Sequence, residues 1–150
     1  VSGCHINPAV TIGQLSIGSI KLQDAVGYLI AQALAALAAI MVAKFFMITS
    51  PLTPSVFDSH IFAAEALGAF FFNFGIAAVV AGKVAKEFSG VVVGGSLLFG
   101  ILIASLTGAA GILNPAVALA LNAASVLYLT APVVGAVLGV QAYTYLTAKH

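Results

Sequence analysis

His5-Ile6-Asn7-Pro8-Ala9-Val10 is the stretch that decides the fold, because its last four residues return as Asn114-Pro115-Ala116-Val117. Each copy has the pattern of a helix start. Proline is favoured at the first helical position, and an asparagine before it can accept hydrogen bonds from the free N–H groups of the first turn. The chain therefore contains two equivalent helix starts, with long apolar segments between them.

Only a short apolar run follows each start, over residues 8–17 and 115–124. About ten residues of α-helix extend roughly 15 Å, which is half of a hydrocarbon core of about 30 Å. We therefore expect two half-helices that enter a membrane from opposite faces and meet near its middle. Their positive N-terminal ends and their asparagine side chains would lie together, as is typical of a selective pore.

The composition is that of an integral membrane protein. Of the 150 residues, 62% are hydrophobic and 6% are charged, whereas soluble globular domains carry about 25% charged residues. A net charge of +1 provides no basic surface for phosphates, so the sequence argues against a nucleic-acid partner. The single cysteine, Cys4, cannot form a disulfide within the chain or a cysteine-rich metal site. No cofactor is expected.

Four further segments are long and apolar enough to cross a bilayer as helices. They are residues 25–46, 61–82, 90–109 and 126–146. We expect one transmembrane channel domain made of these spans and the two half-helices.

The lysines suggest an orientation, because short cytoplasmic loops are enriched in basic residues. We expect the loop with Lys83 and Lys86 to be cytoplasmic. Lys21 and the C-terminus with Lys149 then lie on the same side, and Lys44 lies on the other.

An internal repeat supports an inverted arrangement of the two halves. Residues 28–36 resemble residues 128–136, and each of these stretches follows a half-helix. In the second half, two spans precede the half-helix, whereas no such spans precede the first half-helix. We therefore expect the chain to be the C-terminal part of a six-span protein.

Two signatures carry a family resemblance. Residues 2–11, Ser-Gly-Cys-His-Ile-Asn-Pro-Ala-Val-Thr, resemble the first signature of the aquaporin and glycerol-facilitator family, and residues 111–116, Gly-Ile-Leu-Asn-Pro-Ala, resemble the second. Tyr28, Ala31-Gln32 and Glu65 also match the family. One Asn-Pro-Ala is a weak signal, but two that each open a half-span are a strong one. The resemblance implies an all-α membrane protein with an aquaporin-like inverted repeat and two re-entrant half-helices, truncated at its N-terminus.

The resemblance also implies roles for particular residues, in a homotetramer with one pore per subunit. Asn7 and Asn114 would donate amide hydrogen bonds to the passing solute. Glu65 would be a buried carboxylate that braces the first re-entrant segment. A series of backbone carbonyls would accept hydrogen bonds from the solute on its way to the asparagines: those of Gly3, Cys4, His5, Ala110, Gly111 and Ile112. His5 is either a hydrogen-bonding brace of its loop or a proton site for gating.

The outer filter departs from the family pattern. Where the family normally has an arginine after the second signature, this chain has Val117. Leu102, or Ile101 if the loop is one residue longer, is the expected filter position in the span 90–109. The filter would then be aliphatic, without the charge and the hydrogen-bond donors of arginine.

The sequence therefore predicts a passive channel for water, with small neutral solutes as further candidates, in a lipid bilayer. Within the family, Ala118 resembles the water-type branch, whereas Leu129 resembles the glycerol-type branch. A glycerol or polyol facilitator and a non-conducting membrane protein remain as alternatives. An enzyme is not expected, because no His, Asp, Glu or Cys residues share a spacing suited to nucleophilic or metal chemistry.

Overall fold

The computed structural model describes residues 3–48 and 57–148. Outside these ranges lie Ser2 of the first signature, residues 49–56 between the first two expected spans, and Lys149. Within them the regular elements are all helical. In chain order they are α1 Pro8–Ser16, α2 Leu22–Phe45, α3 Ser59–Val80, the 3-10 turn η1 Lys86–Phe88, α4 Ser89–Leu106, α5 Pro115–Ala120 and α6 Val126–Thr147.

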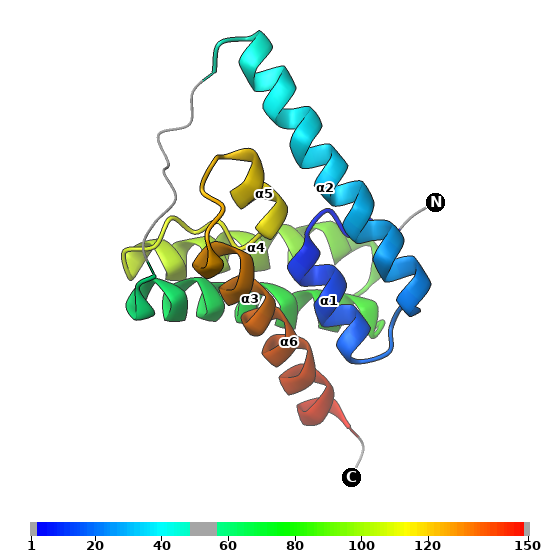
Figure 1. Cartoon of the computed structure of the whole chain (residues 1–150). Coiled ribbons are helices and arrows are strands. Elements are labelled where there is room, and N and C mark those ends of the chain that lie inside the picture. Colours follow the sequence, from blue (N-terminus) through cyan, green and yellow to red (C-terminus); the bar gives the residue numbers. More distant parts are fainter. Residues whose placement is uncertain (1–2, 49–56, 149–150) are drawn as a thin grey trace.

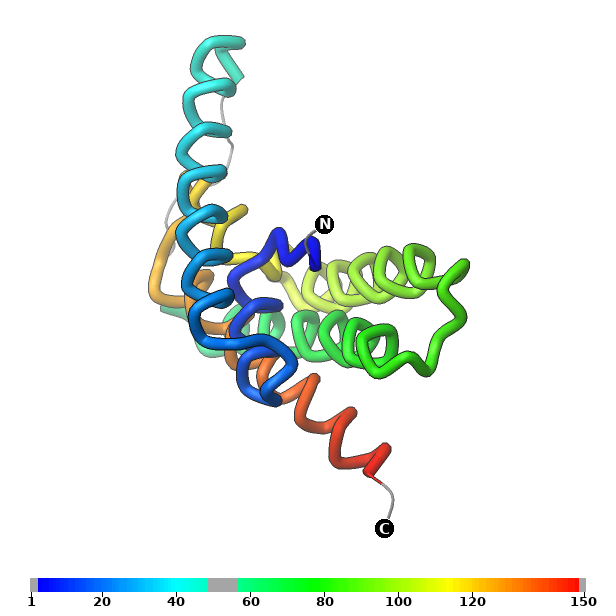
Figure 2. Tube along the Cα trace, turned by 90° about the vertical axis from the view of Figure 1, so that its right-hand side faces the viewer, coloured from blue at the N-terminus to red at the C-terminus, as the bar shows by residue number. Residues whose placement is uncertain are grey.

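Four of these segments have the length and hydropathy of a membrane span. They are Leu22–Phe45, Ser59–Val80, Lys86–Leu106 and Val126–Thr147. The predicted fold class, an all-α membrane protein, is confirmed, and the chain is a multi-pass membrane protein. The short helices α1 and α5 lie in the middle of the molecule, between α2 on one side and the α3–α4 pair on the other (Figures 1 and 2).

Glycines set the close packing of α3 against α4 and α6. A Cβ atom at Gly135 would overlap the backbone of Ala66, and one at Gly139 would overlap the carbonyl of Phe70. Gly68 of α3 and Gly100 of α4 approach each other in the same way. These small residues let the helix backbones touch, as is common where helices pack inside a membrane. These three helices form the closely packed part of the molecule.

Both half-helices end in the same way. After α1, Gly18 has a φ of 70°, and after α5, Asn122 has a φ of 57°. Ser19 then donates its N–H to the Gln14 carbonyl at 3.0 Å, and Ala123 donates to the Ala118 carbonyl at 2.9 Å. These bonds form Schellman motifs, which stop a helix where a residue adopts the left-handed conformation.

Because of this motif, α5 ends at Ala120 instead of reaching the expected residue 124. Asparagine tolerates positive φ better than most side chains, and the apolar run alone did not reveal this stop.

Candidate pore site

The two signature asparagines hold the centre of the molecule together. The Asn7 amide nitrogen donates to the Leu113 carbonyl at 2.9 Å, and the Asn114 amide nitrogen donates to the Ile6 carbonyl at 3.1 Å. Leu113 and Ile6 are the residues that directly precede Asn114 and Asn7. Each asparagine therefore binds the re-entrant segment of the other half.

The same side chains cap their own half-helices. The Asn7 side-chain oxygen accepts the N–H of Ala9 at 2.9 Å, and the Asn114 side-chain oxygen accepts the N–H of Ala116 at 3.0 Å. An amide nitrogen carries two hydrogens, and the bond to the opposite segment uses one of them. The second hydrogen on each asparagine and the positive ends of α1 and α5 can therefore attract the oxygen of a neutral molecule.

Glu65 holds the second re-entrant segment. Its fully buried carboxylate accepts the N–H of Ile112 at 3.0 Å and that of Leu113 at 2.8 Å. The prediction that Glu65 braces the first re-entrant segment is wrong. The reason is that α3 belongs to the second half, where Ala64 packs in one core cluster with Leu113.

Gln32 holds the first re-entrant segment instead. Its amide nitrogen donates to the His5 carbonyl and, at 2.9 Å, to the Thr11 hydroxyl. The sequence resemblance included Gln32 but gave it no role. A buried amide in an otherwise apolar span was the available signal, because such a group needs a partner inside the membrane.

Two tyrosines also contact the re-entrant segments. The Gly3 N–H donates to the Tyr28 hydroxyl at 2.6 Å, and Tyr128 packs in a core cluster with Ile112. The His5 ring stacks on Tyr28 with 4.6 Å between ring centroids. His5 thus contributes its carbonyl, not its ring, to the brace with Gln32.

A cavity of about 330 Å³ lies where the half-helices meet. Asn7 and Asn114 line it together with the three predicted carbonyl residues of the second half, Ala110, Gly111 and Ile112. The remaining lining is apolar, and comes from Ile6, Phe72, Leu97, Ile101, Val117 and Leu121.

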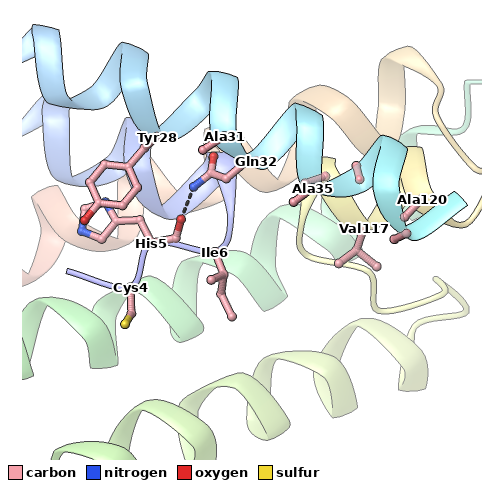
Figure 3. A pocket seen from close by; sticks show the side chains of 12 residues that line it. Cys4, His5, Ile6, Tyr28, Ala31, Gln32, Ala35, Val117 and Ala120 are labelled. Carbon is pink, nitrogen blue, oxygen red and sulfur yellow. Dashed lines mark hydrogen bonds between the residues drawn. The ribbon is translucent and has the colours of Figure 1, made fainter. Parts of the chain in front are cut away.

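A second cavity, of about 410 Å³, lies on the α2 side. Cys4 and His5 line it beside the alanine face of α2, and Ala120 and Val117 of α5 form its far end (Figure 3). Gly3 lines a third cavity, near the start of α2, with His5 and Asp24. The predicted residues therefore surround the meeting point of the half-helices without sharing one cavity.

Ile101, not Leu102, faces Val117 across the first cavity. Leu102 is 51% exposed and is not part of that lining. Ile101 lies one helical turn from Leu97, so both side chains point toward the re-entrant segment. Of the two positions considered, Ile101 therefore lies at this cavity and Leu102 does not, because the helix register turns Leu102 away from the re-entrant segment.

Comparison with known proteins gives one consistent family. The sequence profile of the family described as Major intrinsic protein matches residues 1–145. Aquaporin NIP6-1 of Arabidopsis thaliana is 32% identical over 96% of this chain and 50% of its own length. Aquaporin AqpM of Methanothermobacter thermautotrophicus is 34% identical over 99% of this chain and 70% of its own length.

A third relative has a different name. The glycerol uptake facilitator protein-like 6 of Lactiplantibacillus plantarum is 36% identical over 77% of this chain and 58% of its own length. The chain thus spans from half to about two thirds of the length of these relatives. Their names indicate channels, and the family consists of channels, not enzymes. Because the family profile matches residues 1–145 and the two asparagine-capped half-helices are in contact, the chain belongs to the major intrinsic protein family.

Proposed function

We propose that the protein containing this chain is a passive channel for water and small neutral solutes, which pass the two asparagines in single file. The observation that carries the proposal is the reciprocal pair of hydrogen bonds that places both amide groups at one cavity. Each amide keeps one hydrogen for a solute oxygen. The names of the aquaporin and facilitator relatives support the same activity.

In this proposal the cavity lining sets the selectivity. Carbonyl groups of Ala110, Gly111 and Ile112 accept hydrogen bonds, while Gly3, Cys4 and His5 do so on the other side of the asparagines. Val117 and Ile101 form an aliphatic constriction. Charged solutes are excluded because an ion that loses its water shell in apolar surroundings is strongly disfavoured.

The proposal also includes the orientation of the chain in the membrane and its assembly. The loop with Lys83 and Lys86 and the C-terminus face the cytoplasm, as the lysine distribution favours. Four copies form a homotetramer with one pore each, as the family resemblance implies. The four spans and two half-helices form one domain.

The test is osmotic shrinkage and reswelling of proteoliposomes by stopped-flow light scattering, with sucrose and then glycerol outside. It compares this chain with a version extended at its N-terminus. Fast shrinkage without glycerol entry supports a water channel, and reswelling in glycerol supports a polyol facilitator. Asn7→Ala and Asn114→Ala should each lower the flux by about tenfold, the factor for losing a hydrogen bond of about 1.4 kcal/mol.

Asn122→Gly is the matched control. It removes an asparagine side chain outside the cavity, and glycine accepts the same left-handed backbone, with a φ of 57° at this position. Its flux should equal that of the unchanged protein. If every form, including the extended one, matches empty liposomes for both solutes, the channel proposal is wrong.

A further inference from the structure

Tyr28 and Tyr128 occupy matching places in the internal repeat, and each contacts a re-entrant segment. The Tyr28 hydroxyl accepts the N–H of Gly3 at 2.6 Å, whereas Tyr128 packs in a core cluster with Ile112. Gly3 and Ala110 each lie four residues before the asparagine of their own signature. They are also the first residues of the two proposed carbonyl series. The Tyr28 hydroxyl therefore holds the first residue of the series in the first half.

The residue after Gly3 and the residue after Ala110 both have a left-handed backbone conformation. Cys4 has a φ of 53°, and Gly111 has a φ of 66°. Glycine adopts this conformation freely, whereas a side chain makes it unfavourable. The first re-entrant segment is therefore strained at Cys4 and needs bonds on both sides of it. Tyr28 supplies the bond before Cys4, and Gln32 supplies the bond after it, at the His5 carbonyl.

The ring that carries the Tyr28 hydroxyl packs against the same segment. It stacks on the His5 ring with 4.6 Å between ring centroids. The hydroxyl is therefore an anchor, because the backbone it holds cannot move away without breaking the bond.

We propose that Tyr28 is a positioning residue of the pore, and that its hydroxyl group fixes Gly3, the first residue of the first carbonyl series. Tyr28 does not need to touch the solute. The same bond also holds the strained turn at Cys4. This inference rests on the proposed function, since it explains how that pore keeps its lining in place.

The Gly3 N–H provides a local probe, since the Tyr28 hydroxyl accepts it. Tyr28→Phe keeps the ring and removes the hydroxyl, so this N–H should exchange faster in a deuterium-labelling experiment. We expect a rise of about two- to tenfold, the range for the loss of one hydrogen bond. Tyr128→Phe should leave the rate unchanged. Tyr143→Phe is the control, because Tyr143 packs on Phe74, away from both re-entrant segments.

Flux measurements separate positioning from general stability. In the conducting form, Tyr28→Phe should raise the ratio of glycerol to water permeability without lowering the melting temperature. Adding Cys4→Gly should restore the ratio, because glycine relieves the strain at that position. A labelling rate that Tyr28→Phe leaves unchanged overturns the inference, and so does a double variant no better than the single one.

The labelling experiment does not depend on conduction. If the unchanged protein fails to conduct, the proposed function fails, while the labelling rates still support or overturn the role of Tyr28 at Gly3.

Discussion

α2 and α6 follow equivalent half-helices and begin with similar sequences, yet their surroundings differ. In α6, nine of the 22 residues are buried, whereas in α2 only three of the 24 are. Gly135 and Gly139 of α6 receive the backbone of α3. Ala35 and Ala39 occupy the matching places in α2, and they line an open cavity (Figure 3).

The comparison shows that, among the described helices, α2 has no partner as close as the one that α6 has in α3. α2 also extends beyond the rest of the molecule at its C-terminal end (Figures 1 and 2). Large apolar side chains remain exposed along it: Leu22, Val26, Ile30, Leu34, Leu37, Met41, Val42 and Phe45. In the second half, α3 and α6 pack with their backbones in contact. In the first half, Gln32 and Tyr28 join α2 to the first re-entrant segment.

The largest expected effect is that of a side chain placed in the α3–α6 contact. Gly135→Val would force α6 away from the Ala66 backbone, which cannot move aside. Overpacking of this kind destabilises by about 1–3 kcal/mol or more, and we expect a melting temperature in detergent lowered by several degrees or a failure to fold.

Ala35→Val is the matched change in α2. It should leave the melting temperature of this chain nearly unchanged, because its side chain points into the open cavity. Equal destabilisation by both variants would mean that α2 is as tightly packed as α6, and the contrast between the halves would be lost.

The next effect compares the two braces. Glu65→Leu leaves the N–H groups of Ile112 and Leu113 buried without an acceptor, at about 1–3 kcal/mol for each group. Gln32→Leu removes a neutral donor and leaves the His5 carbonyl beside a cavity that water can enter. We expect a markedly smaller loss of stability from Gln32→Leu, measured as the melting temperature of each variant in the same detergent.

Glu65→Gln is the control for this pair. The side-chain oxygen of the glutamine can still accept one of the two N–H groups. The loss of stability in Glu65→Gln should therefore lie between those of the other two variants. If Gln32→Leu is the most damaging change, the first re-entrant segment depends on its brace more than the second does.

The sequence was sufficient for the fold class, because the two Asn-Pro-Ala signatures and the long apolar runs are local patterns. It was also sufficient to choose five residues that line one cavity, because they lie in or beside the signatures: Asn7, Asn114, Ala110, Gly111 and Ile112. The other carbonyl residues, Gly3, Cys4 and His5, line different cavities. The sequence did not reveal which re-entrant segment Glu65 holds. That depends on which helix packs against which loop, a contact between distant parts of the chain. The choice between Ile101 and Leu102 required the helix register, which a loop of uncertain length does not fix.

The smallest expected effect concerns the helix starts. In the second half, the Asp58 carboxylate caps α3 by accepting the N–H of His60 at 2.7 Å and that of Ile61 at 3.2 Å. In the first half, Lys21 precedes α2 without a side-chain cap. The N–H of Ile61, followed by that of His60, lowers the pKa of Asp58 below its usual range. The contribution of Asp58 is therefore present above pH 4, roughly the pKa of a free aspartate, and it is lost as the pH falls through the lowered pKa.

Asp58→Asn keeps a capping oxygen that does not titrate in this range. We expect the melting temperature of the unchanged chain to fall slightly more between pH 5 and pH 3 than that of Asp58→Asn, a small difference because the carboxylate is exposed to solvent. Lys21→Ala should show the same pH dependence as the unchanged chain. Parallel curves for the unchanged chain and Asp58→Asn would mean that the start of α3 is no better fixed than the start of α2, so the difference between the halves would be confined to their packed interiors.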